Sequence, residues 1–335
     1  MKPSIKICAA SLLAIASMTS AAAETHKLRI AQQYGLSSLP LLVMEDSKLI
    51  EKHAQAAGLK DLEVTWLKLG GPGALTEAII SGDIDFGNGG VPALVTLWEK
   101  TRKLPIAVRA SASVTNMPMD LLTTNPDVKT IADFTSKDKI AVPTIKVSNQ
   151  AMLLEMAAAK EFGQENYAKL DSLTVSLPHP DAMTALLSGS GAVTAHFSAM
   201  PFQNREMKDS KVRTILSSYD VLGGPATNTV AFTTTKFYQN NPKTYAVFVA
   251  ALEEANTIIN ADKRAAAETY KRVVRTNESV DELYSIIADP RVQFTTTPSQ
   301  TMKVAEFMHK IGRLKSAPST WKDLFFPNVH ALSGS

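Results

Sequence analysis

The chain has 335 residues, of which 45% are hydrophobic and 20% are charged, and it carries a formal net charge of +3. This composition is that of an ordinary globular protein, which excludes a collagen, a coiled coil and a disordered chain. The length predicts about two domains. The single cysteine excludes a disulfide framework and any zinc or iron–sulfur site that needs several cysteines.

Residues 1–23 have the three parts of a secretory signal peptide. Lys2 and Lys6 form a short basic region, residues 7–18 are mostly apolar, and the three alanines at 21–23 provide an A-x-A cleavage site. The apolar stretch is shorter than the roughly 20 residues that a membrane-spanning helix needs. We therefore expect the signal to be cleaved after residue 23 and the product to be periplasmic.

Removal of this segment changes the composition that matters for function. Lys2, Lys6 and Cys8 all lie within it, so residues 24–335 are nearly neutral and contain no cysteine. Bulk charge therefore predicts neither a nucleic-acid partner nor any other strongly charged partner. Any preference for a charged ligand must come from a local arrangement of groups.

Strands and helices alternate in the first part of the exported chain. We predict strands at 27–33, 62–69, 83–87 and 104–112, and helices at 40–57, 74–80 and 92–102. Glycine- or serine-rich turns separate most of them. This order is typical of a mainly parallel sheet with helices on both faces.

A second unit of the same kind follows a predicted crossing at 113–125. Its expected strands are 139–143, 173–177, 193–197 and 212–218, and its expected helices are 128–134, 148–162, 181–187 and 200–207. After the break at Gly223-Gly224-Pro225, residues 229–234 are predicted to return to the first unit, and helices are predicted at 243–260, 262–275, 279–288 and 299–314.

The sequence thus predicts an α/β protein with two lobes, two hinge crossings and C-terminal helices. We assign residues 24–115 and 226–335 to a discontinuous lobe 1, and residues 116–225 to lobe 2. A cleft between such lobes, at the carboxyl ends of parallel strands, is the usual place for a ligand.

Small residues immediately before helices are the first candidates for ligand binding. Glycine lets a ligand approach the backbone closely, and the free N–H groups of a first helical turn attract an anion. Short connections also use glycine and serine for purely structural reasons. The candidates of this kind are Ser37, Ser38, Gly71, Gly73, Gly89, Gly90, Ser148, Asn149 and Ser198.

Polar and aromatic side chains near these turns are the second group of candidates. His179 and His196 both follow apolar strands, although a lone histidine is more often structural than a ligand contact. Asn116 and Asn228 are possible hydrogen-bond donors, and Tyr34 could cover an apolar part of a ligand.

No catalytic motif is found. The sequence contains no G-x-x-x-x-G-K-[ST], no H-E-x-x-H, no G-x-S-x-G and no G-x-G-x-x-G. The six histidines are scattered without the spacing of metal ligands. We therefore predict no catalytic residues, no metal and no cofactor.

Several short stretches resemble a known family. They are 37–41 (SSLPL), 81–90 (SGDIDFGNGG), 130–134 (TIADF), 177–189 (LPHPDAMTALLSG) and 321–325 (WKDLF). In their order and spacing they resemble the nitrate/sulfonate/taurine (NMT1/THI5-like) substrate-binding proteins of ABC importers, over residues 26–328. The stretch 191–201 (GAVTAHFSAMP) departs from the family pattern, with His196 and Ser198 where bulk or an acidic residue is usual.

The resemblance implies a type II periplasmic-binding fold that closes around a solute and delivers it to a membrane permease with its ATPase. We expect a monomeric binding protein, not an enzyme, that takes a small organic anion. Its anionic group would lie near Ser38, residues 71–73, residues 89–90 and Ser148, with His179 or His196 adding a charge-assisted bond.

One alternative is an uncharged heterocycle, such as a pyrimidine or thiamin precursor. Another is a periplasmic enzyme that uses one of the histidines as a general base.

Overall fold

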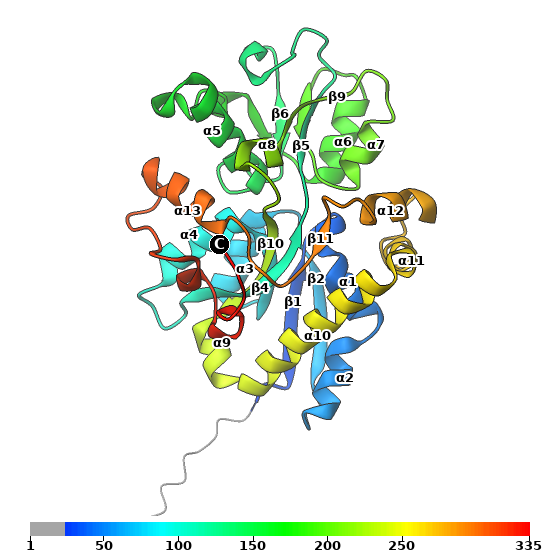
Figure 1. The fold of residues 1–335 in the computed structure, drawn as a ribbon, viewed down its shortest axis with the longest axis vertical. Coiled ribbons are helices and arrows are strands. Elements are labelled where there is room, and N and C mark those ends of the chain that lie inside the picture. The colour runs from blue at the N-terminus through cyan, green and yellow to red at the C-terminus, as the bar shows by residue number, and fades with distance from the viewer. Residues whose placement is uncertain (1–23) are drawn as a thin grey trace, which may run out of the picture.

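The computed structural model describes residues 24–335, which form two lobes with one sheet each (Figure 1). The predicted signal peptide lies outside the described residues. Within residues 24–335, no helix is both long and apolar enough to cross a membrane. The green lobe in Figure 1 is built from the middle of the chain, and the other lobe from both ends.

The first lobe contains a sheet of six strands in the order β11-β4-β10-β3-β1-β2. β1 pairs in parallel with β2 and β3, whereas β10 pairs antiparallel with both β3 and β4. The predicted mainly parallel sheet is therefore wrong in this respect: the sheet is mixed. The strands are β1 (Lys27–Gln32), β2 (Glu63–Lys68), β3 (Phe86–Gly90), β4 (Val108–Asn116), β10 (Thr227–Thr234) and β11 (Gln293–Phe294).

Helices cover this sheet and extend toward the second lobe. Several begin where the sequence supplies a cap: Pro242 occupies the start of α10, and Ser279 and Glu282 form a capping box at α12. The helices are α1 (Leu39–Asp46), α2 (Leu49–Ala56), α3 (Pro72–Ser81), α4 (Val91–Thr101), α9 (Thr235–Asn240), α10 (Pro242–Ala261), α11 (Lys263–Val274), α12 (Val280–Ile287) and α13 (Thr301–Lys310).

The second lobe has a sheet of five strands in the order β7-β6-β8-β5-β9. β6 pairs in parallel with β7 and β8, and β5 pairs antiparallel with β8 and β9. The elements are β5 (Asp120–Thr123), β6 (Ile140–Val142), α5 (Asn149–Phe162), β7 (Thr174–Ser176), α6 (His179–Leu187), β8 (Ala195–Phe197), α7 (Phe202–Glu206), β9 (Arg213–Ser217) and α8 (Ser218–Leu222).

The chain passes between the two sheets twice, at residues 117–119 and 223–226. The first crossing is bound to the start of α8, which leads into the second. The Ser218 amide donates to the Met119 carbonyl at 2.8 Å, and the Ser218 hydroxyl accepts from the Met119 amide at 2.9 Å. Gly223 and Gly224 have φ values of 78° and 137°, which a residue with a side chain rarely adopts. The two crossings therefore lie side by side.

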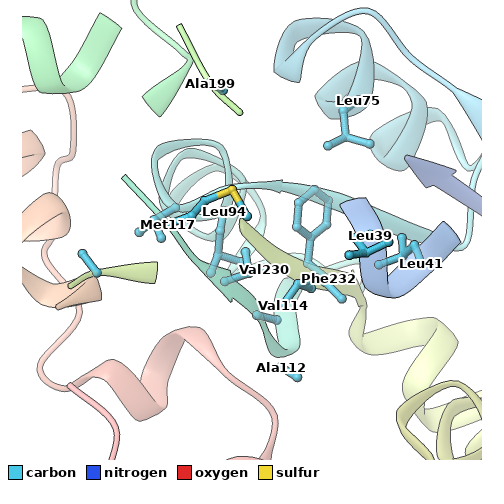
Figure 2. Packing of buried hydrophobic residues seen from close by; sticks show 14 of the residues in the cluster. Leu39, Leu41, Leu75, Leu94, Ala112, Val114, Met117, Ala199, Val230 and Phe232 are labelled. Carbon is cyan, nitrogen blue, oxygen red and sulfur yellow. The ribbon is translucent and has the colours of Figure 1, made fainter. Parts of the chain in front are cut away.

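The core of the first lobe lies around β10, which is buried in the middle of the sheet. Figure 2 shows Val230 and Phe232 of β10 together with Leu94 of α4 and Leu39 of α1, and all four side chains are fully buried. A smaller cluster fills part of the second lobe, formed by Leu122, Ala141, Ala182, Leu186, Val193 and Val212.

Several predicted element boundaries are wrong. The strand predicted at 83–87 is β3, residues 86–90, and the strand predicted at 104–112 is β4, residues 108–116, which shortens the predicted crossing at 113–125. The helix predicted at 40–57 is two helices, because Lys48 takes a left-handed conformation between them. Only residues 131–133 of the helix predicted at 128–134 are helical, in one 3₁₀ turn.

Candidate functional site

A cavity lies between the two lobes, at the carboxyl ends of β1 and β3. Its volume is about 30 Å³, close to that of a single water molecule. In this arrangement of the lobes the space is too small for an organic molecule. The lining residues are Gln33, Tyr34, Ser37, Pro72, Gly90, Asn228 and Thr229 from the first lobe, and Pro143, Ser148, Asn149, Gln150, His179 and Ala199 from the second.

Four helices begin at this cavity. α3 begins at Pro72, α4 follows Gly90, α5 follows Ser148, and α6 begins at His179. The first-turn N–H groups of a helix have no acceptor within the helix, and the helix dipole makes that end electropositive. The lining contains no Asp, Glu, Lys or Arg. The charges that line the cavity directly are therefore the partial charges of backbone groups and of uncharged polar side chains.

The start of α5 is fixed from both lobes. The Ser148 hydroxyl accepts from the Ala151 amide at 3.2 Å, so Ser148 caps α5 as the sequence predicts. Asn149 reaches across the cavity, where its side-chain amide donates to the Asn228 carbonyl at 2.6 Å. A Cβ at Gly90 would lie 2.3 Å from Asn149 Oδ1. A side chain at position 90 would therefore force the Asn149 side chain to move from this place.

A buried chain of hydrogen bonds leads from the cavity into the second lobe. Gln150 Nε2 lies 3.2 Å from His179 Nε2, His179 Nδ1 lies 2.9 Å from His196 Nε2, and His196 Nδ1 lies 2.6 Å from Glu206 Oε1. His196 and Glu206 are fully buried, and Gln150 and His179 are less than 8% exposed. We refer to these four residues as the histidine relay.

The Gln150 amide at one end of the relay and the Glu206 carboxylate at the other determine which ring nitrogens donate and which accept. With the Glu206 oxygen as the acceptor, His196 donates to it from Nδ1, and the Nε2 of a neutral ring is then an acceptor. His179 then donates from Nδ1, and its Nε2 accepts from the Gln150 amide. Burial, followed by the neighbouring His196, holds the pKa of His179 well below its ordinary value. His179 is therefore neutral at pH 7, in agreement with this pattern.

The hydrogen bonds within the relay occupy some polar groups at the cavity and leave others without a partner. Both ring nitrogens of His179 are bonded within the relay, as are both ring nitrogens of His196. The Gln150 side chain retains its carbonyl oxygen and a second N–H, and it lines the cavity. Gln150 is thus the member of the relay with hydrogen-bonding groups left over at the cavity, and a bond from either histidine to a ligand stays a prediction.

Seven of the fourteen candidate binding residues line the cavity. They are Tyr34, Ser37, Gly90, Ser148, Asn149, His179 and Asn228. They come from both lobes, as a cleft site requires. Whether each of them contacts a ligand stays a prediction.

The other seven candidates lie elsewhere. The buried Ser38 hydroxyl donates to the Gln33 carbonyl, and Asn116 bonds Gln293 beside the first crossing. Gly71 and Gly73 face Thr144 of the other lobe. A Cβ added at Gly71 would lie 2.9 Å from Thr144 Oγ1, and one added at Gly73 would lie 3.4 Å from Thr144 Cγ2.

Gly89 does not lie in a turn, as the sequence predicted, but within β3. A Cβ there would lie 2.7 Å from Leu75, so the glycine allows α3 to pack against the strand. His196 is interior in the relay. Ser198 is fully buried, and its amide donates to the Asp120 carbonyl at 2.8 Å.

Six lining residues are absent from the individual candidates named from the sequence, although the first of the two prolines lies within the predicted 71–73 turn: Gln33, Pro72, Pro143, Gln150, Ala199 and Thr229. Gln150 carried a usable signal, because it directly follows Ser148 and Asn149 at a predicted helix start. Gln33 likewise ends the first predicted strand. Within residues 24–335, no group of three or more histidine, cysteine or acidic side chains has the geometry of a metal site.

Ion pairs bridge the lobes on both sides of the cavity. Arg313, beyond α13 of the first lobe, lies 2.5 Å from Glu155 of α5 in the second. On the other side, Arg205 of α7 bonds Glu278 next to α12 at 2.8 Å. Glu155 and Glu278 are 1% and 5% exposed. These contacts join the two lobes, Glu155 and Glu278 being buried at the junction.

Lobe closure is expected to weaken as the pH rises through about 7. Burial raises the pKa of Glu155 to about 7, from an ordinary value near 4.5. Lobe opening exposes this carboxyl and lowers its pKa, so the closed state binds the proton more tightly. Its contribution to closure is complete below about pH 4.5 and is lost as the pH rises to about 7. Small-angle scattering at pH 5 and 8 would measure this as an increase in radius of gyration. Glu155→Gln should remove most of the pH dependence, and an equal increase in that variant would refute this role.

Comparison with known proteins places the fold and the family. The alkanesulfonate-binding protein SsuA from Xanthomonas axonopodis pv. citri, solved with bound MOPS, superposes with a TM-score of 0.68 at 19% identity, covering 86% of this chain and 94% of that one. The periplasmic aliphatic sulphonate-binding protein SsuA from Escherichia coli gives 0.65 at 16% identity, over 90% and 92% of the two chains. The periplasmic nitrate-binding protein NrtA from Synechocystis PCC 6803 gives 0.68 at 15% identity, over 90% and 85%.

These superpositions identify the two-lobed architecture as the periplasmic-binding-protein fold, as the sequence resemblance implied. No protein with a curated description shows significant sequence similarity to the chain. A family model does match: residues 21–274, more than half of the chain, fit that of the NMT1-like family. The chain therefore belongs to the NMT1-like family.

Proposed function

We propose that the protein is the solute-binding component of an ABC importer and encloses a small organic anion between its lobes. The observation that carries this proposal is the convergence of four helix N-termini on a cavity whose lining contains no carboxylate. Such an arrangement stabilises a negative charge without a cationic side chain. The anion would be sulfonate-, carboxylate- or nitrate-like. The sulfonate- and nitrate-binding proteins that share the fold are consistent with this class.

The location, the partners and the motion that we propose follow from the role of a solute-binding component. A binding protein of this kind works in the periplasm and delivers its solute to a membrane permease and, through it, to an ATPase. Hinge motion about the two crossings would open the cavity for uptake and release. No reaction is proposed for the site.

A second candidate ligand is an uncharged heterocycle. The lining offers amide groups from Asn149, Gln150 and Asn228 and no Lys or Arg. Paired donors and acceptors of this kind match the edge of a pyrimidine. The two ligand classes differ in charge, so a single isosteric substitution that adds a negative charge to the cavity can separate them.

Asn149→Asp is expected to lower the affinity for anions at least ten-fold, because it places a carboxylate at the start of α5 inside the cavity. Asn149→Ala is the matched control, since it removes the same amide without adding charge. Calorimetric titration of ethanesulfonate, benzoate, nitrate and uracil into residues 24–335 would measure both. Mass spectrometry of the recovered probe checks for turnover.

The outcomes separate the alternatives. Binding of an anion that Asn149→Asp weakens much more than Asn149→Ala supports the proposal. Binding of uracil alone would replace the anion with a heterocycle. Conversion of a bound probe would establish an enzyme instead.

A further inference from the structure

A second, larger compartment adjoins the cavity on the side of α11 and α12. Its volume is about 250 Å³. Tyr34 lines both spaces, and His179 of the inner cavity is followed by Pro180 of the second. The two spaces therefore share a wall. We call the second space the outer compartment, and its distinguishing residues are Tyr34, Lys68, Phe202, Arg205, Tyr270 and Arg275.

The outer compartment differs from the inner cavity in charge. Its lining includes three cationic side chains and no carboxylate. Arg205 is already compensated by Glu278 at 2.8 Å. Lys68 and Arg275 form no ion pair within residues 24–335, and both are exposed. The compartment therefore offers two uncompensated positive charges, where the inner cavity offers only dipoles.

Aromatic groups complete the compartment. Phe202 and Tyr270 line the compartment from beneath its surface, since they are only 9% and 1% exposed, whereas the ring of Tyr34 is more accessible. The Lys68 ammonium lies 4.9 Å from the centre of the Tyr34 ring, within the range of a cation–π contact. Lys68 is thus held near the wall between the two spaces. Rings beside cations form a surface that suits the apolar body and the acidic end of an organic anion.

We propose that the outer compartment is a second subsite for the same ligand, and that the ligand is an organic dianion. One acidic group would lie at the helix N-termini of the inner cavity, the spacer would lie along Tyr34, and the second acidic group would meet Lys68 and Arg275. This inference rests on the proposed function, because it assigns the far end of the ligand bound there.

Matched pairs of probes test this directly. Benzoate and terephthalate share a ring, and ethanesulfonate and ethane-1,2-disulfonate share a two-carbon chain, so each pair differs by one acidic group. We expect the dianion of at least one pair to bind ten-fold more tightly than its monoanion at low salt. The difference should shrink at 0.5 M NaCl, because exposed charges are screened.

Substitutions of Lys68 and Arg275 test whether these two cations cause the tighter binding of the dianion. In Lys68→Gln/Arg275→Gln, the advantage of the dianion should fall to less than two-fold, while the affinity for the monoanion should stay within two-fold of the unaltered protein. Lys100→Gln, which removes a charge from a different surface opening, should change neither. Circular dichroism would establish that each variant is folded.

The contrary results are distinct. If neither probe of either pair binds, both the proposed function and the second subsite are refuted. If the monoanions bind as tightly as the dianions, only the subsite is refuted. If the double variant weakens both members of a pair equally, the two cations act by general attraction, and the subsite is again refuted.

Discussion

Glu206→Ala is expected to lower the free energy of unfolding by about 2–3 kcal/mol, because it leaves a buried donor unpaired and opens a space beneath it. Glu206 is fully buried and accepts from His196 Nδ1 at 2.6 Å. Without the carboxylate, nothing in the relay fixes which nitrogen of His196 carries the proton. Urea unfolding at pH 7, followed by tryptophan fluorescence, would measure the loss.

Glu206→Gln is the matched variant, because its amide oxygen can still accept from His196. We expect it to cost less than about 1 kcal/mol. Nitrogen-15 spectra of the histidines give an independent readout: both His179 and His196 should carry the proton on Nδ1 in the unaltered protein and in Glu206→Gln. A different tautomer at His179, or equal stability of all three proteins, would contradict the direction assigned to the relay.

Gly90→Ala is expected to keep the lobes apart and to weaken ligand binding at least ten-fold. Its φ of −73° suits alanine, so the backbone should not be strained. The added Cβ would instead lie 2.3 Å from Asn149 Oδ1. Moving Asn149 away would break its bond to the Asn228 carbonyl, made at 2.6 Å across the cavity. The cost therefore falls on closure rather than on folding.

The double variant Gly90→Ala/Asn149→Ala provides the control. Removing the Asn149 amide makes room for the new methyl group, so the radius of gyration should return to that of Asn149→Ala alone. Urea unfolding should show that Gly90→Ala changes stability by less than about 1 kcal/mol. Failure of the second substitution to restore closure would show that the two positions do not collide in solution.

The sequence predicted the features that depend on local chemistry. The two-lobed α/β fold is confirmed by the superpositions, and the cap at Ser148 is present because a serine before a helix satisfies an N–H within its own segment. Helix starts marked by Pro72 and Pro242 are likewise close to their predicted places. These signals lie within a few residues of the structure that they specify.

Features that depend on distant partners could not be predicted. The two histidines of the relay are 17 positions apart, and only the packing of α6 on β8 brings them to 2.9 Å. Gly89 looks like a turn residue in the sequence, but the reason for the glycine is Leu75 of α3. The place of β10 between β3 and β4 depends on pairing across the whole second lobe.

That place of β10 has a consequence for how the protein is made. β4, residues 108–116, joins the first sheet only through β10 and β11, which begin at residues 227 and 293. The ribosome therefore completes the entire second lobe before the first lobe can assemble its sheet. Pairing over such long stretches of chain is slow. The first sheet is therefore expected to be completed only after the second lobe has been synthesised.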